Sequence, residues 1–426
     1  MSQKLLDALL GGTLRDPDGP GLLNVPVASV VIARDLARRA ADLVAPLGFG
    51  KRIAVVMDKN TRTVMGEAVA ASLRTSHEVN EIVFDHSPHP DMDAVAFARS
   101  RTPNDDAVVG VGSGSINDIT KYTAHLNKKP YAVFGTAPSM NGYTSVAAAL
   151  TEDGLKKSLP STAPRGVFLD LGVLAHAPKR LIAAGIGDSV CRATAQVDWL
   201  MANLLLGTKY REAPFMLLKD DEEQLIARIG DIVSGDEDAI ALLARTLVMS
   251  GFGMTICGGS YPASQGEHLI AHYVDMLGQN LPLAYHGEHI AVTTMTMARL
   301  QEKLLSQDNL KISPSSDTLD DFTAHFGQEL GRTCWEAWLP KRIDADKAAT
   351  LNRTLSADWP QMRAKLKAVG RSSAEIGGAL SEAGAPITAD AVGIPRAFYG
   401  EAVRHARQIR DRFTSLDLAS ATGHLQ

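Results

Sequence analysis

The first 170 or so residues alternate between short apolar runs and amphipathic stretches. The apolar runs, which predict strands, cover residues 28–33, 52–57, 81–84, 107–111 and 131–135. Such alternation predicts a parallel sheet with helices on both faces, because successive parallel strands need a crossover segment between them. Ligands of these folds bind beyond the carboxyl ends of the strands, so the residues just after each run are candidates for function.

From Pro178 onward the pattern changes to helical periodicity, which continues to the end of the chain. The sequence therefore predicts an α/β domain over residues 1–175 and an all-helical domain over residues 176–426. One polar, proline-containing stretch, residues 306–318, has the composition of a mobile linker.

Composition limits the class of partner and the compartment. The 426 residues carry a net charge of −5 with no basic block, which argues against a nucleic-acid partner. The three cysteines are widely spaced, which indicates buried thiols in a reducing compartment.

The N-terminal stretch MSQKLLDALLGG predicts a short amphipathic helix rather than a signal peptide. Residues 246–266 are uncharged but rich in glycine, so they predict a core helix and a loop rather than a membrane span. We expect a cytoplasmic protein.

A glycine-rich motif, Gly110-Val-Gly-Ser-Gly-Ser-Ile-Asn-Asp118, follows the fourth apolar run and opens a helix. Glycines let a backbone approach a pyrophosphate, and the free N–H groups of a helix start attract its charge. The motif is equally typical of a tight turn before a helix capped by Ser115 and Asp118. Its spacing departs from the standard dinucleotide fingerprint, so the motif alone does not decide between the two interpretations.

Two further strand ends carry polar residues. Asp58 comes directly after the second run, where a carboxylate can accept hydrogen bonds from a ribose. A helix N-cap is the more frequent role for such an aspartate. Thr136 and Ser139 follow the fifth run and offer two hydroxyl groups, or simply belong to a loop.

Four residues of the predicted helical domain suit a metal. His268 and His272 are four residues apart in a helix-like run, and His286 opens the next helical stretch. Asp188 follows a glycine turn. Twelve histidines in a chain of this length give such a pair by chance in about a third of cases, so the pair alone proves little. Two imidazoles and a carboxylate are nevertheless a sufficient ligand set for a catalytic divalent metal.

Taken together, these motifs resemble those of sn-glycerol-1-phosphate dehydrogenases, within the superfamily of iron-containing alcohol dehydrogenases and dehydroquinate synthases. The resemblance rests on the glycine-rich motif, Thr136–Ser139, Asp188, the segment from Glu267 to His272, and His286-Gly287, which occur in the family's order. Residues 402–419 also resemble the C-terminus of the bacterial, AraM-like branch. The resemblance implies a Rossmann-like N-terminal domain and a helical metal-binding domain.

The resemblance also implies roles for individual residues. Asp188, His268 and His286 would bind the metal, and Asp188 and His272 would face the substrate and act in catalysis. The dinucleotide, NAD or NADP, would lie against Asp58, Gly112, Ser113, Gly114, Ser115, Ile116, Thr136, Ala137, Pro138, Ser139 and Ser145. The metal would be one divalent ion, zinc or nickel. The family has a substrate-contacting aspartate where this chain has Asn141, which removes a charge while keeping an acceptor oxygen.

The function implied is a metal-dependent NAD(P)H oxidoreductase that interconverts dihydroxyacetone phosphate and sn-glycerol 1-phosphate, or a related polyol and ketone, in a homodimer. A dehydroquinate-synthase-like cyclase or lyase that uses NAD transiently is the alternative within the superfamily. A nucleotide-binding protein that has lost its active site is a third hypothesis, and the intact Asp188, His268 and His286 set argues against it.

Overall fold

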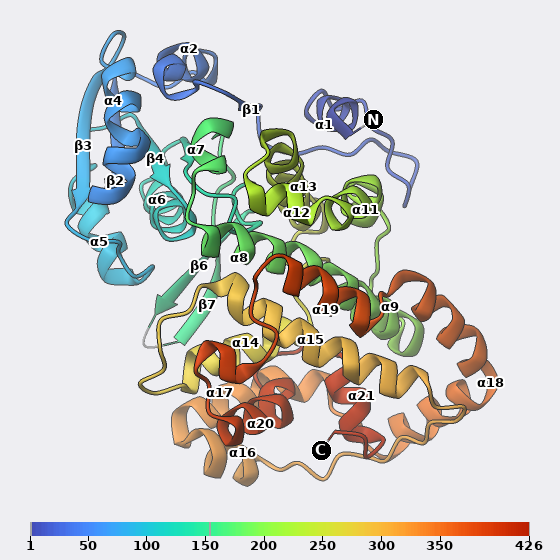
Figure 1. The fold of residues 1–426 in the computed structure, drawn as a ribbon. Coiled ribbons are helices and arrows are strands. Elements are labelled where there is room, and N and C mark those ends of the chain that lie inside the picture. Colours follow the sequence, from blue (N-terminus) through green and yellow to red (C-terminus); the bar gives the residue numbers. More distant parts are fainter. Residues whose placement is uncertain (1, 153–154, 426) are drawn as a thin grey trace. The chain divides into compact units, whose positions relative to one another are not determined.

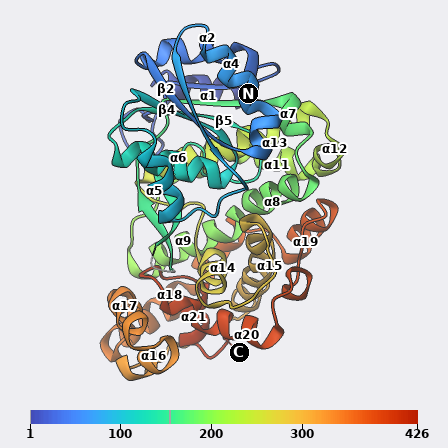
Figure 2. The same cartoon turned by 90° about the vertical axis from the view of Figure 1, so that its left-hand side faces the viewer.

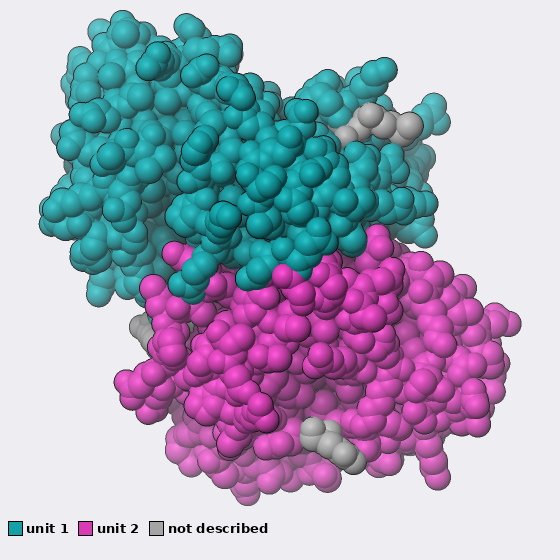
Figure 3. Space-filling view, viewed as in Figure 1, with its two compact units in different colours: residues 1–189, 211–260, 382–384 teal, residues 190–210, 261–381, 385–426 magenta. Residues whose placement is uncertain are grey.

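The computed structural model describes residues 2–152 and 155–425. The chain forms two compact units. Unit 1 consists of Met1–Ser189, Arg211–Ser260 and Glu382–Gly384, and unit 2 of Val190–Tyr210, Tyr261–Ser381 and Ala385–Gln426 (Figure 3). Each unit is therefore assembled from segments that are far apart in the sequence.

Unit 1 is built on a six-stranded parallel sheet with the strand order β1-β8-β5-β4-β2-β3. The strands are β1 (Ser29–Ala33), β2 (Arg52–Asp58), β3 (Glu78–Phe84), β4 (Ala107–Gly112), β5 (Tyr131–Gly135) and β8 (Gly166–Asp170) (Figure 1). The five apolar runs are thus confirmed as strands. The sixth strand, β8, was not predicted.

Helices cover both faces of this sheet, as predicted. Helices α2 and α4 lie on one face, and α5 and α6 lie on the other (Figure 2). Apolar side chains of the sheet, α2 and α4 form one buried core. The helices of this part are α1 (Ser2–Leu10), α2 (Ala40–Val44), α3 (Lys59–Thr61), α4 (Glu67–Leu73), α5 (Met92–Ser100), α6 (Gly114–Leu126), α7 (Leu171–Ala175) and α8 (Lys179–Val190).

An antiparallel hairpin interrupts the alternation between β5 and β8. It consists of β6 (Ala147–Glu152) and β7 (Leu155–Pro160). Strand β6 begins with three alanines, and β7 contains two lysines and a proline, residue types that are depleted in strands. The hairpin was therefore not predicted.

Residues 211–260 belong to unit 1 although they lie beyond the division expected at residue 175. They form α10 (Ala213–Met216), α11 (Lys219–Ala227), α12 (Ile229–Ser234) and α13 (Glu237–Cys257). Helix α13 packs against α7 and β1, and the Thr144 hydroxyl donates a hydrogen bond to the Val248 carbonyl over 2.7 Å. Helix α13 is long and apolar enough to cross a membrane, but 72% of its apolar window is buried, as in a core helix.

Unit 2 contains helices and connecting segments, without strands in the part that the structure describes. The helices are α9 (Arg192–Leu206), α14 (Gly266–Leu277), α15 (His286–Leu305), α16 (Leu319–Phe326), α17 (Gln328–Trp338), α18 (Ala345–Val369), α19 (Ser373–Glu382), α20 (Arg396–His405) and α21 (Ser415–Ala421). Two apolar clusters form its core, one around α9 and α18 and one around α14, α16 and α17.

The segment 306–318 is extended but is held to its surroundings. Leu310 and Ile312 are buried in the first of these clusters. The Asn352 side chain accepts a hydrogen bond from the Ile312 amide and donates one to its carbonyl, both over 2.8 Å. The segment is therefore a packed part of unit 2, in contrast to the linker that its composition suggested.

Candidate active site

The carboxyl ends of β2, β4 and β5 lie side by side in unit 1. Gly112 at the end of β4 pairs with Gly135 at the end of β5, and the Thr136 amide donates to the Gly112 carbonyl over 3.2 Å. Asp58 ends β2, the strand on the other side of β4. The three strand ends singled out in the sequence therefore meet at one edge of the sheet.

The glycine-rich turn allows α6 to pack closely on β4. A Cβ atom on Gly112 would lie 2.5 Å from Cβ of Ile116, and one on Gly110 would lie 2.9 Å from the Thr120 hydroxyl. Among the described residues, no side chain caps the N-terminus of α6. Uncapped first-turn N–H groups behind a close backbone turn are suited to a phosphate.

The capping box expected between Ser115 and Asp118 is not formed. The α6 helix begins at Gly114, with Ser113 as its N-cap residue, so Ser115 already lies inside the helix. The Asp118 carboxylate instead accepts hydrogen bonds from Asn117 Nδ2 over 3.1 Å and from the Ala149 amide over 3.3 Å. Asp118 therefore fixes the β6 hairpin rather than the helix start.

Asp58 is buried, with 4% of its surface exposed, and it caps α3. Its Oδ1 accepts from the Thr61 amide over 2.8 Å, and its Oδ2 accepts from the Ser87 hydroxyl over 3.1 Å. The N-cap interpretation is therefore confirmed. A carboxylate has about four acceptor sites, so these bonds leave capacity for a hydroxyl group of a ligand.

The segment after β5 is held by a buried lysine that the sequence analysis missed. Nζ of Lys121 donates to the Gly142 carbonyl over 2.7 Å, the Ala147 carbonyl over 3.0 Å and Oγ of Ser145 over 3.1 Å. Burial lowers the pKa of Lys121 from 10.5 to about 8. In the sequence this lysine stands among other polar residues of α6, so its burial was not predicted.

Helix α8 presses against the same segment. A Cβ atom on Gly185 would lie 1.8 Å from the Pro138 carbonyl oxygen. Three residues further along α8, Asp188 is 1% exposed, and its Oδ2 accepts a hydrogen bond from the Asn141 amide over 2.8 Å. The segment that includes Thr136, Ala137, Pro138, Ser139, Asn141 and Ser145 is thus fixed by α6 on one side and α8 on the other.

Unit 2 brings three of the predicted histidines together. His268 and His272 stand one turn apart on α14, with ring centroids 5.9 Å apart. His286 is the first residue of α15, and its ring centroid lies 5.2 Å from that of His268 and 6.3 Å from that of His272. Neutral imidazoles gathered in this way are the ligands that zinc and nickel favour, so the residues fit a divalent metal.

Comparison with known proteins gives the family. Residues 31–178 match the family model of iron-containing alcohol dehydrogenases. Glycerol dehydrogenase from Schizosaccharomyces pombe has a similar fold, with a TM-score of 0.62, 17% identity and coverage of 96% of this chain and 92% of that chain. Maleylacetate reductase from Agrobacterium tumefaciens gives a TM-score of 0.63 with 16% identity, covering 97% of both chains.

The sequence relatives are closer. Glycerol-1-phosphate dehydrogenase (NAD(P)+) of Geobacillus thermodenitrificans (strain NG80-2) is 32% identical over 64% of this chain and 69% of its own length. The enzyme of the same name from Geobacillus stearothermophilus is 28% identical over 92% of both chains. The enzyme of the same name from Methanothrix thermoacetophila (strain DSM 6194) is 32% identical over 64% of this chain and 76% of its own length. The chain therefore belongs to the glycerol-1-phosphate dehydrogenase family.

Proposed function

We propose that this chain reduces dihydroxyacetone phosphate to sn-glycerol 1-phosphate with NADH or NADPH, and catalyses the reverse reaction. The observation that carries the proposal is the gathering of His268, His272 and His286 in unit 2 of a chain that belongs to this family. The enzyme is an oxidoreductase. We expect a homodimer in the cytoplasm.

One divalent ion, zinc or nickel, would be held by Asp188, His268 and His286. Two imidazoles and one carboxylate leave coordination positions open for substrate oxygens. When bound, the ion supplies a Lewis acid for the substrate oxygen and the reduced dinucleotide supplies a hydride. The role of the protein is then to orient these groups and to handle the proton.

The dinucleotide would bind along the carboxyl edge of the sheet in unit 1. The uncapped first turn of α6, with Gly112, Ser113, Gly114, Ser115 and Ile116, would receive the pyrophosphate. Asp58 would accept a ribose hydroxyl through its remaining acceptor capacity. The segment Thr136–Ser139 and Ser145 would contact the nicotinamide half. Ser145 is held by Lys121, and Gly185 of α8 lies close to Pro138.

His272 would donate the proton that the ketone oxygen takes up as C2 receives the hydride. Its imidazole stands one helical turn from His268, so His272, which is not a proposed ligand, lies beside a proposed metal ligand. Asn141, whose amide is fixed on Asp188, would offer its side-chain oxygen to a substrate hydroxyl. The two carbons that do not react would thereby be oriented relative to C2.

The test is steady-state oxidation of NADH by the purified protein with dihydroxyacetone phosphate. The protein would first be stripped with a chelator and then reloaded with zinc or nickel. We expect activity only in the reloaded samples, with sn-glycerol 1-phosphate as the product by chiral analysis. A single turnover of bound NAD with no net NADH consumption would instead favour a cyclase or lyase and would contradict the proposal.

A further inference from the structure

We infer that Glu267 is a positioning residue for His268: it accepts a hydrogen bond from Nδ1 of His268 and thereby directs Nε2 of that ring toward the metal. This inference rests on the proposed function, since it concerns the same metal. Glu267 is a buried acid that is not among the proposed metal ligands.

Glu267 is completely buried next to His268 at the start of α14. Its Oε1 accepts a hydrogen bond from the Gln265 amide over 2.7 Å and lies 2.9 Å from Nδ1 of His268. Its Oε2 lies 3.4 Å from the Thr194 hydroxyl of α9. Both oxygens therefore have defined neighbours within unit 2.

These contacts fix which ring nitrogen of His268 carries the hydrogen. A backbone amide can only donate, so Oε1 of Glu267 acts as an acceptor toward Gln265. An ionised carboxylate has no hydrogen to donate, so in its contact with His268 the Nδ1 atom is the donor and carries the hydrogen. In a neutral imidazole the other nitrogen, Nε2, is left with its lone pair for a metal. A carboxylate on the far nitrogen also raises the basicity of a ligating histidine.

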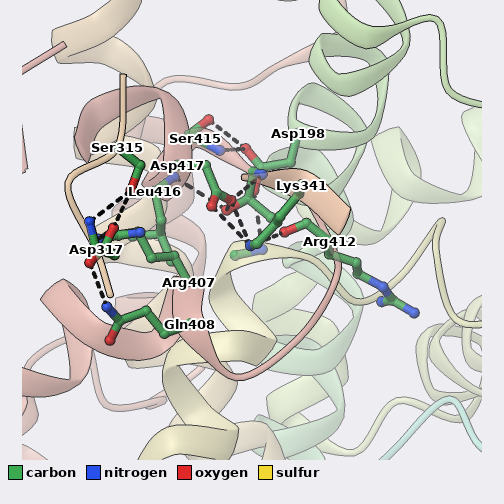
Figure 4. Close-up of polar contacts among 12 residues, drawn as sticks. Asp198, Ser315, Asp317, Lys341, Arg407, Gln408, Arg412, Ser415, Leu416 and Asp417 are labelled. Atoms are coloured by element: carbon green, nitrogen blue, oxygen red, sulfur yellow. Dashed lines mark hydrogen bonds and ion pairs between the residues drawn. The ribbon is translucent and has the colours of Figure 1, made fainter. Parts of the chain in front are cut away.

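A buried network keeps this glutamate in place. The Gly266 amide donates to Oδ2 of Asp198 over 3.1 Å, and Gln301 donates to Oδ1 of Asp198 over 2.9 Å. The Ser415 amide donates to the same Oδ1 over 3.0 Å (Figure 4). Asp198 lies four residues after Thr194, on the same face of α9. The backbone at the start of α14, from which Glu267 projects, is thereby anchored by α9, α15 and α21.

Unit 2 contains a second histidine–carboxylate pair that serves as a matched control. Nδ1 of His289 lies 3.1 Å from Oδ1 of Asp275, so the contact has the same chemistry, although it joins α14 to α15 whereas Glu267 and His268 both lie on α14. His289 is not among the proposed ligands. Loss of the Asp275 charge should therefore leave metal affinity unchanged.

The experiment measures zinc affinity by competition with a chromophoric chelator, for the full-length wild type, Glu267→Gln, Glu267→Met and Asp275→Asn. Gln retains the shape of Glu267 and one acceptor oxygen. Its new NH₂ group can donate to the Thr194 hydroxyl, because that hydroxyl already donates to the Cys191 carbonyl over 2.8 Å. We expect affinity to fall about tenfold in Glu267→Gln and up to about a hundredfold in Glu267→Met. Asp275→Asn should match the wild type.

A second readout needs neither a variant of Glu267 nor bound metal. The metal-free, ¹⁵N-histidine-labelled wild type should give a long-range ¹H–¹⁵N spectrum in which His268 carries its hydrogen on Nδ1. The assignment would come from comparison with His268→Ala. A hydrogen on Nε2, or equal affinity losses in Glu267→Gln and Asp275→Asn, would overturn the inference. A wild type that binds no zinc but has the Nδ1–H tautomer would instead contradict the proposed function and leave the Glu267 contact established.

Discussion

The backbone amide of Asn141 donates a hydrogen bond to Oδ2 of Asp188 over 2.8 Å, and both residues are buried in unit 1. The bond uses the main chain of Asn141, so it does not depend on which side chain stands there. Among the described residues, Nδ2 of Asn141 has no hydrogen-bond partner. The side chain is therefore available for a ligand next to a carboxylate proposed to bind the metal.

The first prediction concerns this position. If the substrate is dihydroxyacetone phosphate, Asn141→Asp should raise kcat/KM by about two- to thirtyfold, because a hydrogen bond to a charged acceptor is worth about 1.5–3 kcal/mol against about 1 for a neutral one. If this chain prefers a substrate with an acceptor at that point, the substitution should lower activity on it. Kinetics on a panel of polyol phosphates and unphosphorylated ketones distinguish the two. Equal rates on every compound would mean that Asn141 does not select the substrate.

The second prediction removes a proposed ligand. His268→Ala should lose the metal and the activity while retaining the fold, because the remaining donors cannot complete a stable site. Elemental analysis and circular dichroism of the purified variant provide the measurement. His289→Gln is the control, since its ring bonds Asp275 and is not a proposed ligand. Full metal occupancy in His268→Ala would exclude this histidine as a ligand.

The third prediction concerns cofactor preference. Asp58 should repel the 2′-phosphate of NADPH, so we expect the wild type to prefer NADH. Asp58→Asn should raise kcat/KM with NADPH several-fold, because removal of one like charge near an exposed phosphate is worth about 1 kcal/mol. Asn is as good an N-cap as Asp, so α3 and the melting temperature should be little changed. Comparable kcat/KM values for NADH and NADPH in the wild type would contradict the expected role of Asp58 in cofactor preference.

The fourth prediction compares two helical glycines. Gly185→Ala should destabilise the protein by about 1–3 kcal/mol and weaken NADH binding, because the new methyl group would displace Pro138 and its neighbours. Gly378→Ala on α19 meets no atom within 4 Å and should stabilise by about 0.5–1 kcal/mol. Thermal unfolding and titration of NADH fluorescence provide the measurements. A Gly185→Ala protein with wild-type NADH affinity would show that this packing does not support the dinucleotide segment.

The fifth prediction follows from Asp198. Burial, together with the nearby charge of Glu267, raises the pKa of Asp198 from 3.8 to about 7, whereas hydrogen bonds from Ser415 and Gln301 act in the opposite direction. The folded state then binds more protons than the unfolded state between these values, so this contribution to stability is present below about pH 4 and is lost as pH rises to about 7.

Denaturant unfolding of the wild type and Asp198→Asn across this range tests the linkage. The stability of the wild type relative to the variant should decrease from about pH 4 to about pH 7 and remain constant above it. If the difference in unfolding free energy between the two proteins does not change with pH, Asp198 has the same pKa in the folded and unfolded states.

Much of the sheet could be predicted, because strands buried on both faces read as continuous apolar runs. Strand β8 was missed since its residues merge with the apolar start of α7. Residues 306–318 were taken for a linker because composition does not reveal a partner such as Asn352, which lies 40 residues away. The helices of residues 211–260 join unit 1 for a similar reason: the contact of Thr144 with Val248 spans 104 residues.

The candidate site was predictable only through family motifs. The spacing of His268 and His272 indicates that they share one helix face, but the sequence does not indicate that His286 lies close to them. The contact of Glu267 with His268 could not be predicted either, because neighbouring residues in a helix normally point in different directions. It forms here at the first turn of α14, where the Gln265 amide donates to Glu267 and the Gly266 amide donates to Asp198.

The anchoring of α14 by Ser415 has a consequence for the order of folding. The Ser415 amide and Oδ1 of Asp198 are separated by 217 residues along the chain (Figure 4). Lys341 and its partner Asp417 are separated by 76 residues. Contacts between residues so far apart form slowly, because the long loop between them must close first. The histidine helix should therefore gain its support in a late step of refolding, and metal capture should follow that step.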